Sequence, residues 1–135
     1  MNLSPRRRSW IGAVVLVGIM YALVGIAFAA PATGVRAWRL AAWGVSAIGY
    51  ATHIAYERFR LGNPPGRASL HVAFGVALGA FGLAVGANLH SLSVESTPQH
   101  RHLLLLALVI WPAITALPAF LVALGLSAGL ARASR

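Results

Sequence analysis

Long stretches with almost no charge are the feature of this sequence that most limits its fold. Four of them are long enough to cross the hydrocarbon core of a bilayer, which takes about 20 helical residues. They cover residues 10–30, 37–56, 69–92 and 103–131. Because lipid offers the backbone no hydrogen-bond partners, such segments must satisfy their own N–H and C=O groups as helices. The sequence therefore predicts an all-α integral membrane protein with four transmembrane helices.

The composition supports a membrane environment. The 135 residues are 59% hydrophobic and only 10% charged, whereas about a quarter of an average soluble domain is charged. There is no cysteine, which excludes disulfides, thiolate metal sites and cysteine nucleophiles. All eleven basic residues are arginine, a bias that we attribute to the codon usage of a GC-rich genome.

The segments between the apolar stretches predict how the helices are connected. "APATG" and "GNPPG" are short turns rich in proline and glycine, and "SLSVESTPQHRH" is a longer polar loop. Short links join antiparallel neighbours in helical proteins. We therefore expect one domain over residues 1–135, folded as an up-down-up-down four-helix bundle.

The distribution of arginine predicts the orientation in the membrane. With a cytoplasmic N-terminus, the cytoplasmic side carries eight arginines and the opposite side three. The three are Arg36, Arg39 and Arg101. Cytoplasmic flanks are enriched in positive charge, so we expect both termini in the cytoplasm and the protein in a bacterial inner membrane. The net charge of +9 then indicates contact with anionic lipid head groups and not with nucleic acid.

The first apolar stretch also fits a second interpretation, as a cleavable signal sequence. It follows three arginines and ends in Ala27, Phe28 and Ala29, an A-x-A pattern. Its 21 apolar residues exceed the roughly 7–15 usual in a signal sequence. We therefore expect these residues to remain as the first transmembrane helix.

Small residues line one face of the second and third helices. At about 100° per residue, the third helix gathers Gly75, Gly79, Gly82 and Gly86 on one side, with His71 and His90 at its ends. The second helix places Ser46, Gly49, His53 and Glu57 on one side. Helices in lipid associate through such faces. Because "GNPPG" folds the chain back, we expect the two faces to meet, although a flat glycine face also suits a planar haem or quinone.

His53 and His71 are the strongest candidates for a functional site. Both lie about one turn from the cytoplasmic ends of adjacent predicted helices, so they share a similar depth. Glu57 follows His53 by four residues, the spacing of side-chain neighbours on a helix. The pattern favours a polar network of His53 and Glu57. It also fits a haem b or quinone held between His53 and His71, or a role in proton handling.

A second histidine group lies near the opposite side. His90, Glu95, His100 and His102 fall within thirteen residues. Imidazole and carboxylate groups are ligands of first-row metal ions. These residues form a candidate metal site.

The remaining motifs do not indicate catalysis. The chain has no nucleotide-binding loop, no H-E-x-x-H motif and no serine in a nucleophile elbow. We expect no enzymatic activity and a role as an accessory subunit or self-associating scaffold in a membrane assembly, with a second copy or other membrane subunits as partners. The alternatives are a redox subunit using His53 and His71, and a small channel or transporter whose fourth helix bends at Pro112 and Pro118.

Overall fold

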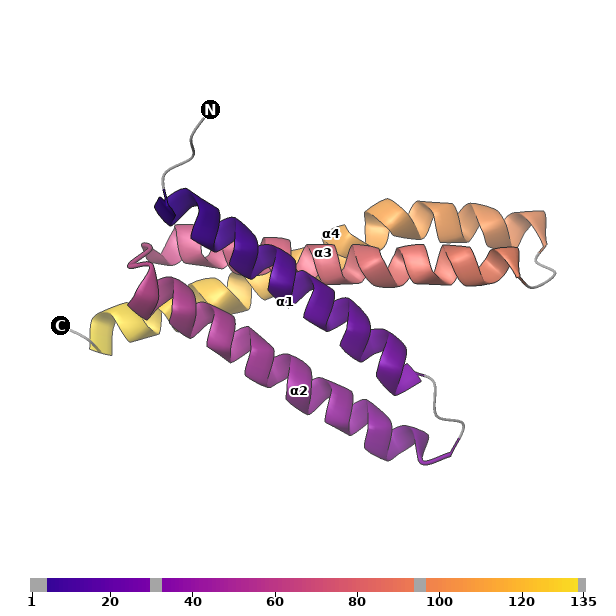
Figure 1. Cartoon of the computed structure of the whole chain (residues 1–135), viewed down its shortest axis with the longest axis horizontal. Coiled ribbons are helices and arrows are strands. Elements are labelled where there is room, and N and C mark those ends of the chain that lie inside the picture. Colours follow the sequence, from indigo (N-terminus) through magenta and orange to yellow (C-terminus); the bar gives the residue numbers. More distant parts are fainter. Residues whose placement is uncertain (1–4, 30–32, 94–96, 134–135) are drawn as a thin grey trace.

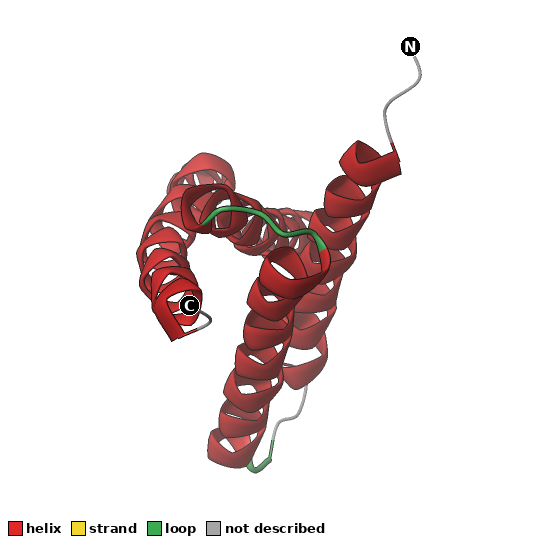
Figure 2. Cartoon of the chain, turned by 90° about the vertical axis from the view of Figure 1, so that its left-hand side faces the viewer, coloured by secondary structure: helices red, strands yellow, loops and turns green. Residues whose placement is uncertain are grey.

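A computed structural model describes residues 5–29, 33–93 and 97–133, and nearly all of them are helical. The helices are α1 (Pro5–Ala29), α2 (Val35–Ala55), α3 (Pro65–Leu92) and α4 (Pro98–Ala133), with one π-helical turn, η1 (Tyr56–Arg60), after α2. Figure 2 shows helices joined by short loops and no strand in this part of the chain. The all-α prediction is confirmed.

Several helices are longer than predicted because polar residues join them. α3 begins at Pro65 and α4 at Pro98, where proline suits the first turn because that turn leaves backbone N–H groups unused. Most of the polar segment 91–102, expected as a loop, belongs to α3 or α4, and only residues 93–97 link them. Glu95 lies outside the described residues.

Three of the helices are long and apolar enough to cross a membrane: α1 over Ser9–Phe28, α3 and α4. α2 is not among them, so of the four spans predicted from the sequence three have the length and apolarity required. Arg36 and Arg39 occupy its first turns, and Ser46, Thr52 and His53 add polar groups further along. These residues make α2 the least apolar of the four helices.

The helices form two hairpins, α1 with α2 and α3 with α4 (Figure 1), and the expected up-down-up-down four-helix bundle is not evident. α3 is central, because it packs on α1 and along α4. α2 meets α3 only near its own C-terminal end, where His53 and Ile54 are its buried residues. All four helices therefore come together at one end, beyond which α1 stays against α3 while the two hairpins diverge (Figure 2).

We call the end where the hairpins meet the closed end, and the end with the 93–97 link the open end. A small apolar core of Ile54, Val72 and Ala123 marks the closed end. Tyr50 packs against this core, and its hydroxyl donates a hydrogen bond to the carbonyl oxygen of Ala119. α4 changes direction in its middle (Figure 1), where Pro112 and Pro118 lie, and its second half reaches this core.

The glycine face of α3 packs mainly on α1 and meets α2 at Gly75, whereas it was expected to pack on α2 along its length. A methyl group added at Gly79 would lie 2.5 Å from Cβ of Tyr21, and one at Gly82 would lie 2.9 Å from Cβ of Ala22. At Gly86 the nearest atom is Cδ1 of Ile26, at 3.9 Å. Gly49 of α2 likewise faces α1, against Met20. α1 is thus the common partner of both small faces, because its own Gly18 and Ala22 allow close approach.

Candidate functional site

A buried carboxylate, that of Glu57, lies at the centre of the closed end. The residue is 0% exposed. Its Oε2 atom lies 2.9 Å from Nδ1 of His71 and accepts a hydrogen bond of 2.5 Å from Nδ2 of Asn63. A buried carboxylate is stable only when such partners replace its hydration. Glu57 therefore joins the end of the first hairpin to the start of the second.

The chain after Glu57 is shaped to bring Asn63 back to it. The π turn η1 ends with the N–H of Leu61 donating to the carbonyl oxygen of Tyr56 at 3.1 Å. Gly62 follows with φ of +63°, a left-handed conformation that glycine adopts without steric cost. The Asn63 N–H then donates to the Glu57 carbonyl oxygen at 3.0 Å, so backbone and side chain of Asn63 both bind Glu57.

His53 lies one helical turn before Glu57 and is 2% exposed. Its Nε2 is 3.8 Å from Oε1 of Glu57, an ion-pair distance longer than a hydrogen bond. Both ring nitrogens of His53 and Oε1 of Glu57 lack a hydrogen-bond partner among the described residues. Gly75 makes room for the ring, because an added methyl group would lie 3.3 Å from Cε1 of His53.

Trp10 of α1 covers the ring of His71. The two ring centroids are 4.2 Å apart and the planes differ by 7°, which is a stacked arrangement. His71 itself is 7% exposed. α1, α2, η1 and α3 thus each contribute to one polar cluster, which we define as Trp10, His53, Glu57, Asn63 and His71.

The charge state of Glu57 follows from two opposing effects. Burial raises the pKa of its carboxyl group, whereas the contacts from His53, Asn63 and His71 lower it, and the net pKa is below the ordinary value. Glu57 is therefore ionised at neutral pH.

The structure brings His53 and His71 to the same cluster, but not as two ligands of one haem. Coordination of a haem by both residues requires an imidazole nitrogen on each side of the iron. Here each ring directs a nitrogen toward the carboxylate of Glu57, which lies between them, and Trp10 covers one face of His71. The residues present do not fit a haem between His53 and His71.

The residues of the second candidate site are not brought together. His90 lies near the end of α3, and His100 and His102 lie in the first turns of α4, all with exposed side chains. Within residues 5–29, 33–93 and 97–133, no three histidine or acidic side chains are placed to hold one metal ion. Both helices extend into the segment that was predicted as a loop. His90 is therefore held on α3, and His100 and His102 on α4, instead of lying together in one loop.

Trp10 and Asn63 are members of the cluster that the sequence did not single out. Asn63 was expected only as part of the "GNPPG" turn. Arg58 also takes part, because its Nη1 donates to the carbonyl oxygen of Asn63 at 2.7 Å. The Gly-Asn pair directly after a helix was the one available signal, since Asn in a turn often bonds back to the preceding chain.

Comparisons with known proteins add no assignment to this geometry. No protein family, no curated protein and no solved structure matches the chain significantly.

Proposed function

We propose that this chain is a multi-pass protein of a bacterial inner membrane that associates with a second copy of itself through α2, and so acts as a scaffold in a membrane assembly. The polar cluster around Glu57 is the fixed joint of each copy. Both termini face the cytoplasm.

The arginines support the orientation in this proposal. Arg58 and Arg60 of η1, Arg67 at the start of α3 and Arg132 at the end of α4 belong to the closed end. Arg36, Arg39 and Arg101 belong to the opposite ends of their helices. An excess of positive charge marks the cytoplasmic side, which favours a cytoplasmic closed end.

α2 has to carry the chain back across the membrane that α1 crosses in this proposal. The stack of Trp10 on His71 puts the starts of α1 and α3 at the same end, so the intervening helix carries the chain back. Its 21 residues span about 31 Å, close to the thickness of a hydrocarbon core. In the proposed membrane, α2 therefore crosses with the other three helices.

The exposure of α2 is the observation that carries the proposal. α2 is the least apolar helix, yet its buried residues are only His53 and Ile54. Polar and small residues face lipid poorly and face other helices well. One exposed side of α2 combines small residues at positions three or four apart, namely Ala41, Gly44, Ala47 and Ala51. A methyl group added at Gly44 would meet nothing within 4 Å, which leaves this side open to a partner helix.

The partner that we propose for α2 is a second copy of the same chain. α4 offers a further open pair, Gly125 and Gly129, at the G-x-x-x-G spacing of self-associating membrane helices. Other membrane subunits are the competing partners. They would leave the purified chain monomeric.

The test is the native mass of the purified protein in detergent, measured by light scattering with the detergent contribution subtracted. We expect an oligomer for the unmodified chain and a monomer for Gly44→Ile, which places a branched side chain in the proposed contact. Gly12→Ile is the matched control, because Gly12 is also open within 4 Å but lies on α1. A monomeric unmodified chain would contradict self-association. Loss of the oligomer in Gly125→Ile but not in Gly44→Ile would place the contact on α4 instead of α2.

A further inference from the structure

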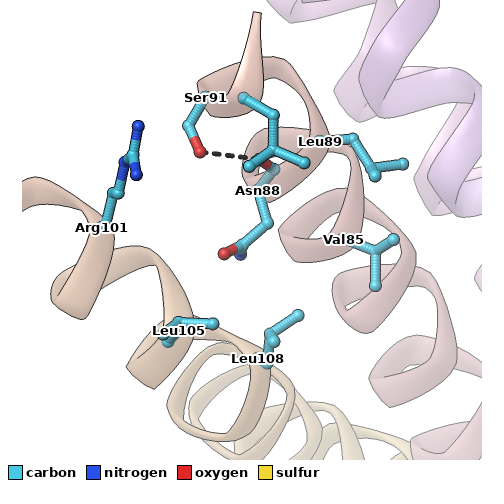
Figure 3. Close-up of a pocket in the computed structure, with 8 residues that line it drawn as sticks. Val85, Asn88, Leu89, Ser91, Arg101, Leu105 and Leu108 are labelled. Carbon is cyan, nitrogen blue, oxygen red and sulfur yellow. Dashed lines mark hydrogen bonds between the residues drawn. The ribbon is translucent and has the colours of Figure 1, made fainter. Parts of the chain in front are cut away.

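A cavity lies at the open end, between the last turns of α3 and the first turns of α4 (Figure 3). Its volume is about 340 Å³, within the range of roughly 300–1,000 Å³ for sites that hold small ligands. The polar residues in its lining are Asn88, Ser91 and Arg101, and apolar ones include Val85, Leu105 and Leu108. It lies away from the cluster around Glu57, at the other end of α3.

Polarity changes along the cavity in one direction. α3 and α4 run antiparallel beside the link, so Val85 and Leu108 lie furthest from the link, while Ser91, Leu92 and Arg101 lie nearest to it. The lining is thus apolar toward the middle of the two helices, and its cationic residue, Arg101, lies toward their ends. A phospholipid in the proposed membrane has the same order, with acyl chains inside and a phosphate at the surface.

Of the two neutral polar residues, Asn88 joins the two walls and Ser91 bonds within α3. Nδ2 of Asn88 donates to the carbonyl oxygen of Ala84 in its own helix at 2.8 Å and to that of Leu104 in α4 at 2.7 Å. The amide group has two hydrogens, so both are used. The Ser91 hydroxyl donates to the carbonyl oxygen of Asn88 at 2.7 Å, as Figure 3 shows.

Arg101 is the third polar residue in the lining of the cavity, and it is cationic. Its guanidinium side chain is exposed and can donate two parallel hydrogen bonds to a phosphate. The chain has two acidic residues. Glu57 is bound to His71 and Asn63 at the closed end, and Glu95 lies outside the described residues. No carboxylate in the described part of the chain therefore competes with a phosphate for Arg101.

We propose that this cavity binds one anionic phospholipid, with its phosphate on Arg101 and an acyl chain against Val85, Leu105 and Leu108. The inference rests on the proposed membrane location. It does not depend on the contact through α2. The net negative charge of the head group distinguishes this ligand from zwitterionic lipids, which place a cation of their own beside the phosphate.

The experiment uses the full chain in nanodiscs of equimolar phosphatidylglycerol and phosphatidylcholine. After gentle release into detergent, native mass spectrometry counts the phospholipids that each protein molecule retains. We expect retention of one phosphatidylglycerol, favoured about tenfold over phosphatidylcholine, which is the range of a charge-assisted hydrogen bond. Arg101→Gln should remove this preference. Val85→Trp should reduce retention of both lipids by filling the apolar part.

Arg132→Gln is the matched control, because it removes the same charge from the far end of α4. Equal loss of preference in Arg132→Gln would show a general charge effect and overturn the site. An unchanged preference in Arg101→Gln would also overturn the site. So would displacement of the retained phosphatidylglycerol by free glycerol phosphate as effectively as by added phosphatidylglycerol. Resistance of the unmodified chain to alkaline extraction from vesicles tests membrane insertion separately, so failure of the membrane proposal is distinguishable from failure of the lipid site.

Discussion

The closed and open ends of this molecule are held together in different ways. At the closed end, Glu57, His53 and His71 come from two hairpins and are almost completely buried. At the open end, a side-chain hydrogen bond from Asn88 to the carbonyl oxygen of Leu104 joins α3 to α4. A cavity of about 340 Å³ lies beside it. The middle of α2 is also exposed, with Trp43 at 77%.

The difference shows how a chain with few polar residues can fix one end of its helices and leave the other end accessible. A buried carboxylate with two partners is costly to disturb, so it defines one arrangement of the hairpins. Away from this cluster, the exposed side of α2 and the cavity at the open end are the surfaces that the proposed second copy and lipid would cover. Three substitutions test this division, from the largest expected effect to the smallest.

Replacing Glu57 with alanine should have the largest effect. The substitution leaves Nδ2 of Asn63 and Nδ1 of His71 without their acceptor, and breaking such a buried pair costs about 3 kcal/mol. The free energy of unfolding, measured by circular dichroism in mixed micelles with increasing dodecyl sulfate, should fall by that amount. Glu57→Gln keeps one acceptor oxygen and should lose less. Equal stability of Glu57→Ala and the unmodified chain would contradict the central role of this cluster.

Replacing Gly79 with alanine tests the contact between α1 and α3 on which both ends depend. The added methyl group would lie 2.5 Å from Cβ of Tyr21 and 3.2 Å from the backbone oxygen of Gly18. Overpacking of this kind costs about 2 kcal/mol, and the same unfolding measurement should show the loss. Gly12→Ala is the control, since its methyl group meets nothing within 4 Å and alanine favours the helix. A stabilised Gly79→Ala would mean that α1 packs elsewhere.

Replacing Asn88 with leucine should have the smallest effect of the three. It removes the hydrogen bond to Leu104 across α3 and α4, which is worth about 1 kcal/mol. Thr115→Val is the control, because that hydroxyl bonds only to Trp111 and Pro112 of its own helix. A loss in Asn88→Leu as large as that in Glu57→Ala would show that the open end is fixed as firmly as the closed end.

Part of this arrangement could be predicted from the sequence. Long apolar stretches have only helix available to them in lipid, so the all-α fold and the approximate helix positions followed from composition and spacing. The four-residue spacing of His53 and Glu57 placed them on one face of a helix, because helical geometry is local. Prolines at residues 65 and 98 began helices earlier than expected, since proline suits a first turn as well as a loop.

The remaining features depended on contacts between distant parts of the chain. The glycine face of α3 is visible in the sequence, but its partner was decided by the shape of α1, which approaches closely at Gly18 and Ala22. Likewise, Trp10 reaches His71 only because α1 crosses the start of α3. The sequence by itself determined the helices and their small and polar faces, because these follow from backbone hydrogen bonding and a fixed helical period. Only the tertiary structure decided which faces meet, because that choice depends on how closely whole helix surfaces fit.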